Sequence, residues 1–212
     1  TKYYLHSYGD AESDGGLLSV EAPSTEEPVD RFTYEPSNPV ASLGSQYQTF
    51  DFCGPHDRSK LQQRDDVLTF TTAPLAEDTE VTGPIRATIW ASSDAIDTDF
   101  TAALTDVEPD GKAIALCEGI VRARFRNGTD NPEMITPGDI YEFGIDMWNT
   151  SNMFKKGHSI RVEISSSNFP RYNRNLNTGN PIATDTEIRT ANQTLYHGVE
   201  NPSHLTLPII PR

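Results

Sequence analysis

The chain has few of the features that mark secreted, zinc-binding or membrane proteins. Among its 212 residues there are two cysteines, too few for the disulfide framework of a small secreted domain. No Cys/His spacing predicts a zinc site. No apolar run approaches the roughly 20 residues that cross a bilayer, and no signal peptide is visible. Cys117 lies in a predicted strand and is expected to be a small core residue, whereas Cys53 lies in a loop.

Basic residues are also scarce. The chain has 17 Lys and Arg against 31 Asp and Glu, which gives a net charge of −14. Such a surface repels phosphate backbones and anionic lipid, so we expect neither nucleic acid nor membrane as a partner. Solubility is the simplest interpretation of the charge. We expect a cytoplasmic location, with secretion kept as an alternative.

The signatures of a self-sufficient enzyme are missing as well. Nucleophilic catalysis needs a Ser or Cys with a base and an orienting acid, but the chain has no G-x-S-x-G elbow. It has no phosphate loop or dinucleotide fingerprint, so we expect no cofactor. His158 precedes a predicted strand and is expected to cap backbone carbonyls in a turn. We therefore predict no catalytic residue in this chain alone.

What the chain has in abundance is alternation of apolar and polar residues with a period of two. No helical stripe exceeds two turns, and the turn signal Glu108-Pro109-Asp110-Gly111 predicts a hairpin between two strands. This pattern predicts an all-β fold, a β-sandwich of the jelly-roll kind. Strands are expected in residues 2–6, 17–19, 67–72, 85–93, 100–107, 113–125, 140–148, 159–166 and around 205–209.

We predict a single domain over residues 1–212, because no stretch has the composition of a linker. Its first 62 or so residues are expected to be largely irregular and to pack on the sandwich, since prolines interrupt them repeatedly. The chain begins with Thr1 rather than Met and enters a strand at once. We interpret this as a piece of a longer protein.

An acidic cluster, Asp94, Asp97 and Asp99, lies between two predicted strands. Oxygen-rich clusters can bind calcium, but this spacing lacks the glycine and the distal glutamate of an EF-hand loop. The alternative is structural: the carboxylates cap backbone N–H groups and pair with arginines. We favour the structural role and expect no metal.

Two loops carry the candidate site residues. Residues 44–60 place Tyr47, Phe50 and Phe52 in a hydrophilic stretch, where they are expected either to be buried under the domain or to contact a partner. Residues 165–175 are dense in hydroxyls, amides and arginines, which must satisfy one another or face a partner. The candidates in this second loop are Asn168, Phe169, Arg171, Asn173 and Arg174. If the role of the second loop is internal, Arg171 and Arg174 are expected to pair with Asp97 or Asp99.

A set of motifs along almost the whole chain, in constant order and spacing, closely resembles the C-terminal domain of the X-Pro dipeptidyl-peptidase and cocaine-esterase group of α/β-hydrolases. The motifs are Gln63-Arg64-Asp65-Asp66-Val67-Leu68, Glu80-Val81-Thr82-Gly83, Asp97-Thr98-Asp99-Phe100-Thr101-Ala102, Asp106-Val107-x-Pro109-Asp110-Gly111, Gly138-Asp139-Ile140-Tyr141, Phe154-x-x-Gly157-His158, Ser165-Ser166-Ser167-Asn168-Phe169-Pro170, Asn173-Arg174-Asn175 and Pro202-Ser203-His204-Leu205.

The resemblance implies a jelly roll of the galactose-binding-like type that packs on an upstream α/β-hydrolase domain. That domain holds the Ser-Asp-His triad, so no triad residue can be assigned here. The whole enzyme would act on a small-molecule ester or on an amide or peptide. In relatives, the region matching residues 44–60 approaches the acyl pocket, which makes Tyr47 and Phe50 pocket candidates. The chain departs from the esterase-like pattern there.

Two other functions fit a jelly roll. A carbohydrate-binding module would need a row of exposed aromatics, and Trp90 and Trp148 could serve, although we expect both in the core because they fall inside strands. An oligomerisation module would make the chain a homo-oligomer. The fold alone supports no sugar ligand.

Overall fold

The computed structural model describes residues 1–46 and 53–211. They form three short 3₁₀ helices, η1 (Ala11–Ser13), η2 (Leu61–Gln63) and η3 (Ala123–Phe125), and eleven strands. The strands are β1 (Lys2–His6), β2 (Gly16–Ser19), β3 (Asp30–Tyr34), β4 (Leu68–Thr71), β5 (Thr79–Ser93), β6 (Asp99–Val107), β7 (Ala113–Arg122), β8 (Tyr141–Phe154), β9 (Ser159–Ser165), β10 (Ala191–Tyr196) and β11 (His204–Thr206).

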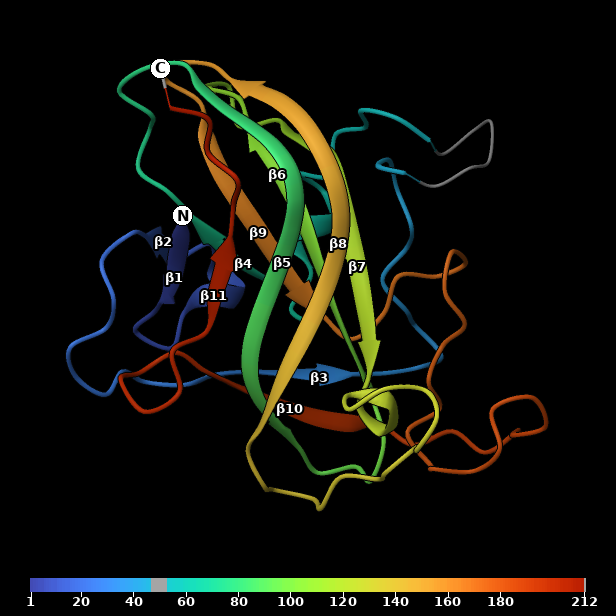
Figure 1. Cartoon of the computed structure of the whole chain (residues 1–212). Coiled ribbons are helices and arrows are strands. Elements are labelled where there is room, and N and C mark those ends of the chain that lie inside the picture. The colour runs from blue at the N-terminus through green and yellow to red at the C-terminus, as the bar shows by residue number, and fades with distance from the viewer. Residues whose placement is uncertain (47–52, 212) are drawn as a thin grey trace.

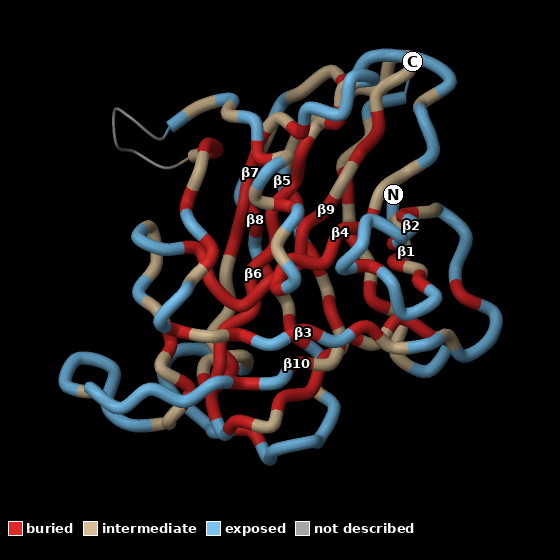
Figure 2. Tube along the Cα trace, turned by 180° about the vertical axis from the view of Figure 1, so that it is seen from behind, coloured by how far each residue is buried: buried red, intermediate tan, exposed pale blue. Residues whose placement is uncertain are grey.

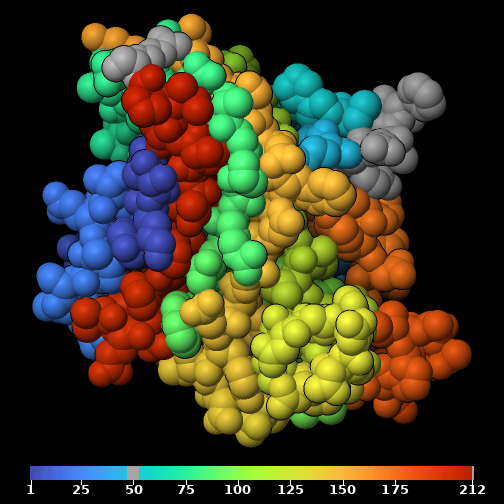
Figure 3. Space-filling model, in the orientation of Figure 1, coloured from blue at the N-terminus to red at the C-terminus, as the bar shows by residue number. Residues whose placement is uncertain are grey.

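The strands lie in two facing layers (Figure 1). Within the connected sheet their order is β3-β10-β5-β11-β1-β2-β4-β9-β6-β7, and β8 pairs with β5. The front layer holds β2, β1, β11, β5 and β8, of which Figure 3 shows the last four side by side, and the back layer holds β4, β9, β6 and β7. The short parallel pairing of β2 with β4 joins the layers. The predicted all-β sandwich is confirmed, and the jelly-roll, galactose-binding-like type stays a prediction.

The core lies between the layers, where Figure 2 shows the strands lined with buried residues. Alternate residues of each strand point inward, as Ile85, Ile89 and the alanines between and beyond them do on β5. Phe100 of β6 and Phe143 of β8 meet across the core with ring centroids 4.8 Å apart. Each large apolar side chain buried in this way contributes about 1.5–3 kcal/mol.

The strands predicted from alternation are confirmed, with changed ends. The hairpin between β6 and β7 turns at residues 108–111. β5 begins at Thr79 and β8 runs to Phe154, so both are longer than predicted, and β7 gives way to η3 after Arg122. The extra length of β5 and β8 comes from their mutual pairing, which continues beyond the clearly alternating segments.

The prediction that the N-terminal part is largely irregular was only partly right, because Asp30–Tyr34 forms β3 within it. Pro28 and Pro36 flank this strand rather than interrupt it, so neither removes a hydrogen bond from its ladder with β10. The partner β10 was missed because its centre is polar. Its Gln193 is buried and donates to Thr98 Oγ1 at 2.7 Å, so a polar side chain occupies a core position.

Residues 36–46 and 53–66 pack across the outer face of the back layer. Arg58 N–H donates to Ala113 O at 2.8 Å, and Ala115 N–H donates to His56 O at 2.9 Å, which ties this segment to the edge of β7. Gln62 is buried against Thr105 of β6. No helix in the described ranges is long and apolar enough to cross a membrane.

Candidate functional site

Two loops far apart in sequence are bonded together at one end of the back layer. Val40 N–H donates to Ser167 Oγ at 2.8 Å, and Phe169 N–H donates to Val40 O at 2.9 Å. Ser42 N–H donates to Phe169 O at 2.7 Å, and its hydroxyl accepts from Arg171 N–H at 3.0 Å. Residues 40–42, which lead into the first candidate loop, therefore form one structure with the second candidate loop.

A bridge between Ser45 and Gly54 closes the base of the first loop, with N–H···O distances of 2.8 and 3.0 Å. Gly44, at φ +77°, lies so close to β7 that an added Cβ would meet Ala115 Cβ at 2.7 Å. A side chain at position 44 would push the loop away from the sheet. The candidates Tyr47, Phe50 and Phe52 lie outside the described residues.

We call residues 40–45, 54–58 and 167–174 the loop platform. Asn168 is buried in it, Asn173 is exposed, and Phe169 is 38% exposed. The half-buried Arg174 donates to Pro36 O at 2.8 Å, and its guanidinium lies 5.3 Å from the centre of the Phe169 ring. The platform thus presents an aromatic ring and polar groups at its surface.

An ion network joins two arginines of the platform, Arg58 and Arg171, to two buried glutamates of the back layer, Glu118 and Glu163. Arg58 bonds Glu163 through Nε at 3.0 Å and Nη2 at 2.7 Å, and Arg171 Nη1 bonds Glu118 Oε1 at 2.7 Å. Arg58 Nη1 lies 3.8 Å from Glu118 Oε2, which links the two pairs. Burial acts to lower the pKa of Arg58, but the Glu163 carboxylate more than offsets it, so the pKa lies above its ordinary value.

Strand register explains why the two glutamates meet here. Ala103 of β6 pairs with Glu118 of β7 on one side and with Glu163 of β9 on the other. All three side chains therefore lie in one row on the outer face of the back layer, and the small Ala103 leaves room for the guanidinium of Arg58. Sequence reasoning missed this network. Its only signal was a glutamate in each of two otherwise apolar strands.

Arginines hold two members of the acidic cluster. Arg124 donates to Asp97 through its backbone N–H at 2.9 Å and Nε at 2.8 Å, and Arg122 donates to Asp99 at 2.7 and 2.9 Å. Asn175 Nδ2 lies 2.9 Å from both carboxylates. The pairing of Arg171 or Arg174 with these aspartates was wrong, because Arg122 at the end of β7 and Arg124 in η3 bind them instead. Burial raises the pKa of Asp99.

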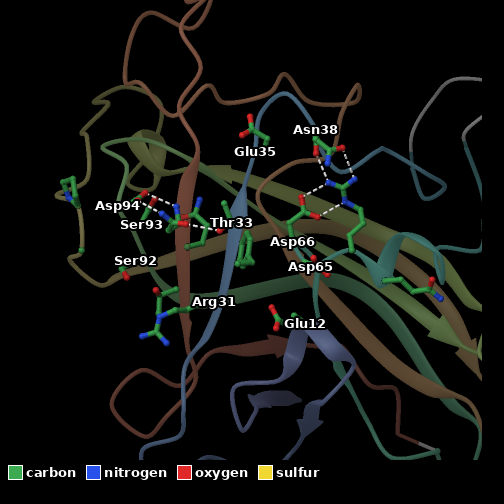
Figure 4. Close-up of a pocket in the computed structure, with 18 residues that line it drawn as sticks. Glu12, Arg31, Thr33, Glu35, Asn38, Asp65, Asp66, Ser92, Ser93 and Asp94 are labelled. Atoms are coloured by element: carbon green, nitrogen blue, oxygen red, sulfur yellow. Dashed lines mark hydrogen bonds and ion pairs between the residues drawn. The ribbon is translucent and has the colours of Figure 1, made fainter.

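The third aspartate, Asp94, lines a polar hollow of about 1120 Å³ beside β3. Figure 4 shows Arg31 and Thr33 on that strand, with Asp94 on one side and Asp66 on the other. Asp94 accepts two hydrogen bonds from Asn192, at 2.9 and 2.8 Å, and so caps the start of β10. The one aromatic residue among the described residues that line the hollow is Phe32, which is 5% exposed. It therefore offers no ring on which a sugar could stack.

Trp148 was expected in the core, but its side chain is 61% exposed. The pairing of β5 with β8 shifts register between Pro84 and Arg86, so β8 carries an extra residue opposite them. Trp148 occupies this bulge with φ +66°, and its N–H donates to Asp146 Oδ1 at 2.8 Å. The bulge turns the ring outward. Trp90, the other tryptophan, is half-buried.

The histidines show no catalytic arrangement in the part of the chain that the structure describes. Each is bonded to a carboxylate or to a backbone carbonyl, and none to a Ser or Cys side chain. His158 bonds Asp106 at 2.8 Å, so its expected role in capping carbonyls was wrong. The other pairs are His6 with Glu27, His56 with Cys53 O, His197 with Asp30 and Glu27, and His204 with Pro202 O.

The two cysteines are both free thiols with different surroundings. Cys53 is exposed and Cys117 is buried, as expected for a core residue. Burial raises the pKa of the Cys117 thiol to about 12, which makes it unreactive at neutral pH. No group of three or more His, Cys, Asp or Glu residues placed to bind a metal occurs within residues 1–46 and 53–211.

The fold and this arrangement define a class: an all-β sandwich domain in which the described residues form no catalytic constellation. Comparison with known proteins then identifies the family. The chain belongs to the X-Pro dipeptidyl-peptidase C-terminal non-catalytic domains, whose family model matches residues 1–206. The resemblance stated from the sequence is confirmed, and the chain is an accessory domain of hydrolases of this group.

Several relatives are similar over the whole chain. Cocaine esterase of Rhodococcus sp. (strain MB1 Bresler) is 49% identical over 218 residues, covering 100% of this chain and 38% of the relative. The structure of an alpha-amino acid ester hydrolase superposes with a TM-score of 0.87 at 27% identity, covering 99% of this chain and 36% of that one. An aminopeptidase from a Thaumarchaeota archaeon of marine sediment gives a TM-score of 0.85 at 27% identity, covering 100% and 37%. The chain thus spans little more than a third of the length of these relatives.

Proposed function

We propose that the chain is the C-terminal accessory domain of a serine hydrolase that cleaves esters, with a catalytic α/β-hydrolase domain upstream. The observation that carries this proposal is the 49% identity to cocaine esterase across the entire chain, which makes up 38% of that relative. A second relative, from Mycobacterium bovis, is named a putative serine esterase and is 32% identical over 118 residues.

The substrate class follows from the names of the relatives. Cocaine esterase and the alpha-amino acid ester hydrolase act on esters, and the archaeal protein is an aminopeptidase. We propose a small-molecule ester as the substrate of the whole enzyme, with an amide or peptide as the second candidate. The higher identity to the esterase favours the ester.

We assign the loop platform as the face that meets the catalytic domain. It combines the exposed Phe169 ring, the half-buried Arg171 and Arg174, and the exposed amide of Asn173. Aromatic and arginine side chains supply much of the binding energy of protein interfaces, while hydrogen-bonding groups supply specificity. Tyr47, Phe50 and Phe52 stay candidates for the substrate pocket or the interface.

An activity assay tests whether catalysis resides in the upstream domain and not in this chain. The 212-residue chain and the longer hydrolase are each given p-nitrophenyl esters of increasing acyl length. We expect turnover by the longer protein and none above background by the chain. Robust turnover by the chain alone would contradict the proposal, and so would a longer gene with no G-x-S-x-G elbow upstream.

The two free thiols support a cytoplasmic location, since reducing compartments keep cysteines unpaired.

Two alternative functions have their own tests. Binding on a glycan array would favour a carbohydrate module, and self-association of the longer protein in sedimentation would favour a role in oligomerisation.

A further inference from the structure

The two buried carboxylates each hold a different part of the loop platform. Arg58, bonded to Glu163, also donates to Leu43 O at 2.9 Å. Arg171, bonded to Glu118, also donates its backbone N–H to Ser42 Oγ at 3.0 Å. The adjacent residues Ser42 and Leu43 are therefore held by the backbone N–H of Arg171 and by the guanidinium of Arg58, and a buried carboxylate holds each of these arginines.

The anchoring is rigid because of the chemistry of its members. Glu118 and Glu163 are 1% and 3% exposed, and a buried carboxylate without a cation is strongly unfavourable. Arg58 forms a two-pronged contact with Glu163, which fixes direction as well as distance. Gln62 Nε2 adds a bond to Glu163 Oε1 at 2.7 Å. The guanidinium of Arg58 therefore has little freedom to shift.

We propose that the ion network of Arg58, Glu118, Glu163 and Arg171 is a positioning element, which sets the placement of the loop platform on the back layer and so tunes substrate binding by the hydrolase. The effect on substrate rests on the proposed function, whereas the placement does not. A well-packed apolar replacement could preserve stability, because buried ion pairs add little net stability over apolar residues of similar volume. What such a replacement would lose is the direction that the carboxylates impose on Arg58 and Arg171.

The chain supplies its own reporter for this placement. Cys53 is exposed and directly precedes Gly54, which forms the bridge with Ser45. The other cysteine, Cys117, is buried. A nitroxide spin label will therefore attach at Cys53 selectively. Its electron paramagnetic resonance spectrum reports how firmly the base of the first loop is held.

The variants are Glu118→Gln, Arg171→Met and Arg171→Lys. Glu118→Gln removes the negative charge of that glutamate on the sheet. Arg171→Met removes the positive charge on the loop, and Arg171→Lys keeps a positive charge but lacks the forked guanidinium. We expect the mobile fraction of the label to rise about twofold or more in Glu118→Gln and Arg171→Met, with partial recovery in Arg171→Lys. Arg171→Lys keeps a cation beside the buried Glu118, so it is expected to fold even if Glu118→Gln or Arg171→Met does not.

Asp30→Asn is the matched control. Asp30 is 2% exposed, is bonded to His197 at 2.9 Å and lies outside the platform. Loss of the Asp30 carboxylate should lower the melting temperature without changing the mobility of the label. Unchanged label mobility in both Glu118→Gln and Arg171→Met, with a melting temperature lowered as in Asp30→Asn, would overturn the proposal and leave the network a structural feature only.

Kinetics of the same variants in the longer hydrolase test the effect on substrate. We expect KM to rise about threefold or more while kcat changes less, because the platform affects binding and not the reacting atoms. If the label becomes mobile and the kinetics stay unchanged, the network positions the loop, but its proposed effect on substrate binding is refuted. Absence of hydrolase activity in the longer wild-type protein would refute the proposed function instead.

Discussion

Single residues in this domain are placed by strand register more than by proximity in sequence. Asp99 lies directly opposite Arg122 in the ladder of β6 and β7. The pairing of Val107 with Ala113 next to the turn would put Asp99 opposite residue 121, but a bulge between Leu104 and Thr105 shifts the ladder by one. The sequence could therefore predict that the aspartates bind arginines, but not which arginines, because it does not reveal the bulge.

Removal of one partner from a buried pair should be costly. Asp97 is fully buried, and Asp97→Ala leaves Arg124 Nε without its acceptor and removes one of the two carboxylates that accept from Asn175. We expect the free energy of unfolding of Asp97→Ala to fall by about 3–5 kcal/mol in urea titration. The control is Asp110→Ala, which removes the exposed pair with Lys112 and should leave the midpoint of urea unfolding unchanged. Equal midpoints for the two variants would contradict the structural role of Asp97.

At the scale of elements, alternation predicted most of the strands and failed for β3 and β10. β9 has apolar residues at every second position, and β6 has them from Phe100 to Leu104, so their existence follows from the sequence. β3 and β10 stabilise each other and carry polar residues such as Gln193, whose burial depends on Thr98, the residue just before β6. A polar strand of this kind can be recognised only once its neighbours are in place.

The bulge in β8 gives a prediction for that element. Trp148 adopts φ +66°, which is unfavourable for any residue with a Cβ and most of all for a β-branched one. Trp148→Gly should be at least as stable as the wild type, because the exposed ring contributes little packing. Trp148→Val should lose about 1 kcal/mol. Thermal unfolding of the two variants measures the difference, and a Val variant more stable than the Gly variant would show that the bulge is absent.

The whole molecule is a sandwich with one elaborated end, where the loop platform covers the outer face of the back layer. Its residues were partly predictable: Phe169 and Arg174 lie at the surface, as a partner site requires, whereas Asn168 is buried and bonded within the domain. The network beneath was not predictable, because Arg58 is 60 residues from Glu118 and 105 from Glu163 in sequence. Only the paired register of three strands brings these charges together.

Hydrogen exchange tests most directly whether the platform seats a catalytic domain. Peptides covering residues 38–46 and 168–176 are compared between the isolated chain and the longer hydrolase. We predict that their exchange slows markedly in the longer protein, since docking excludes water from this face, while peptides covering residues 20–28 and 127–139 are unchanged. Equal exchange of residues 38–46 and 168–176 in both proteins, with new protection elsewhere, would contradict the assignment of the platform as the docking face.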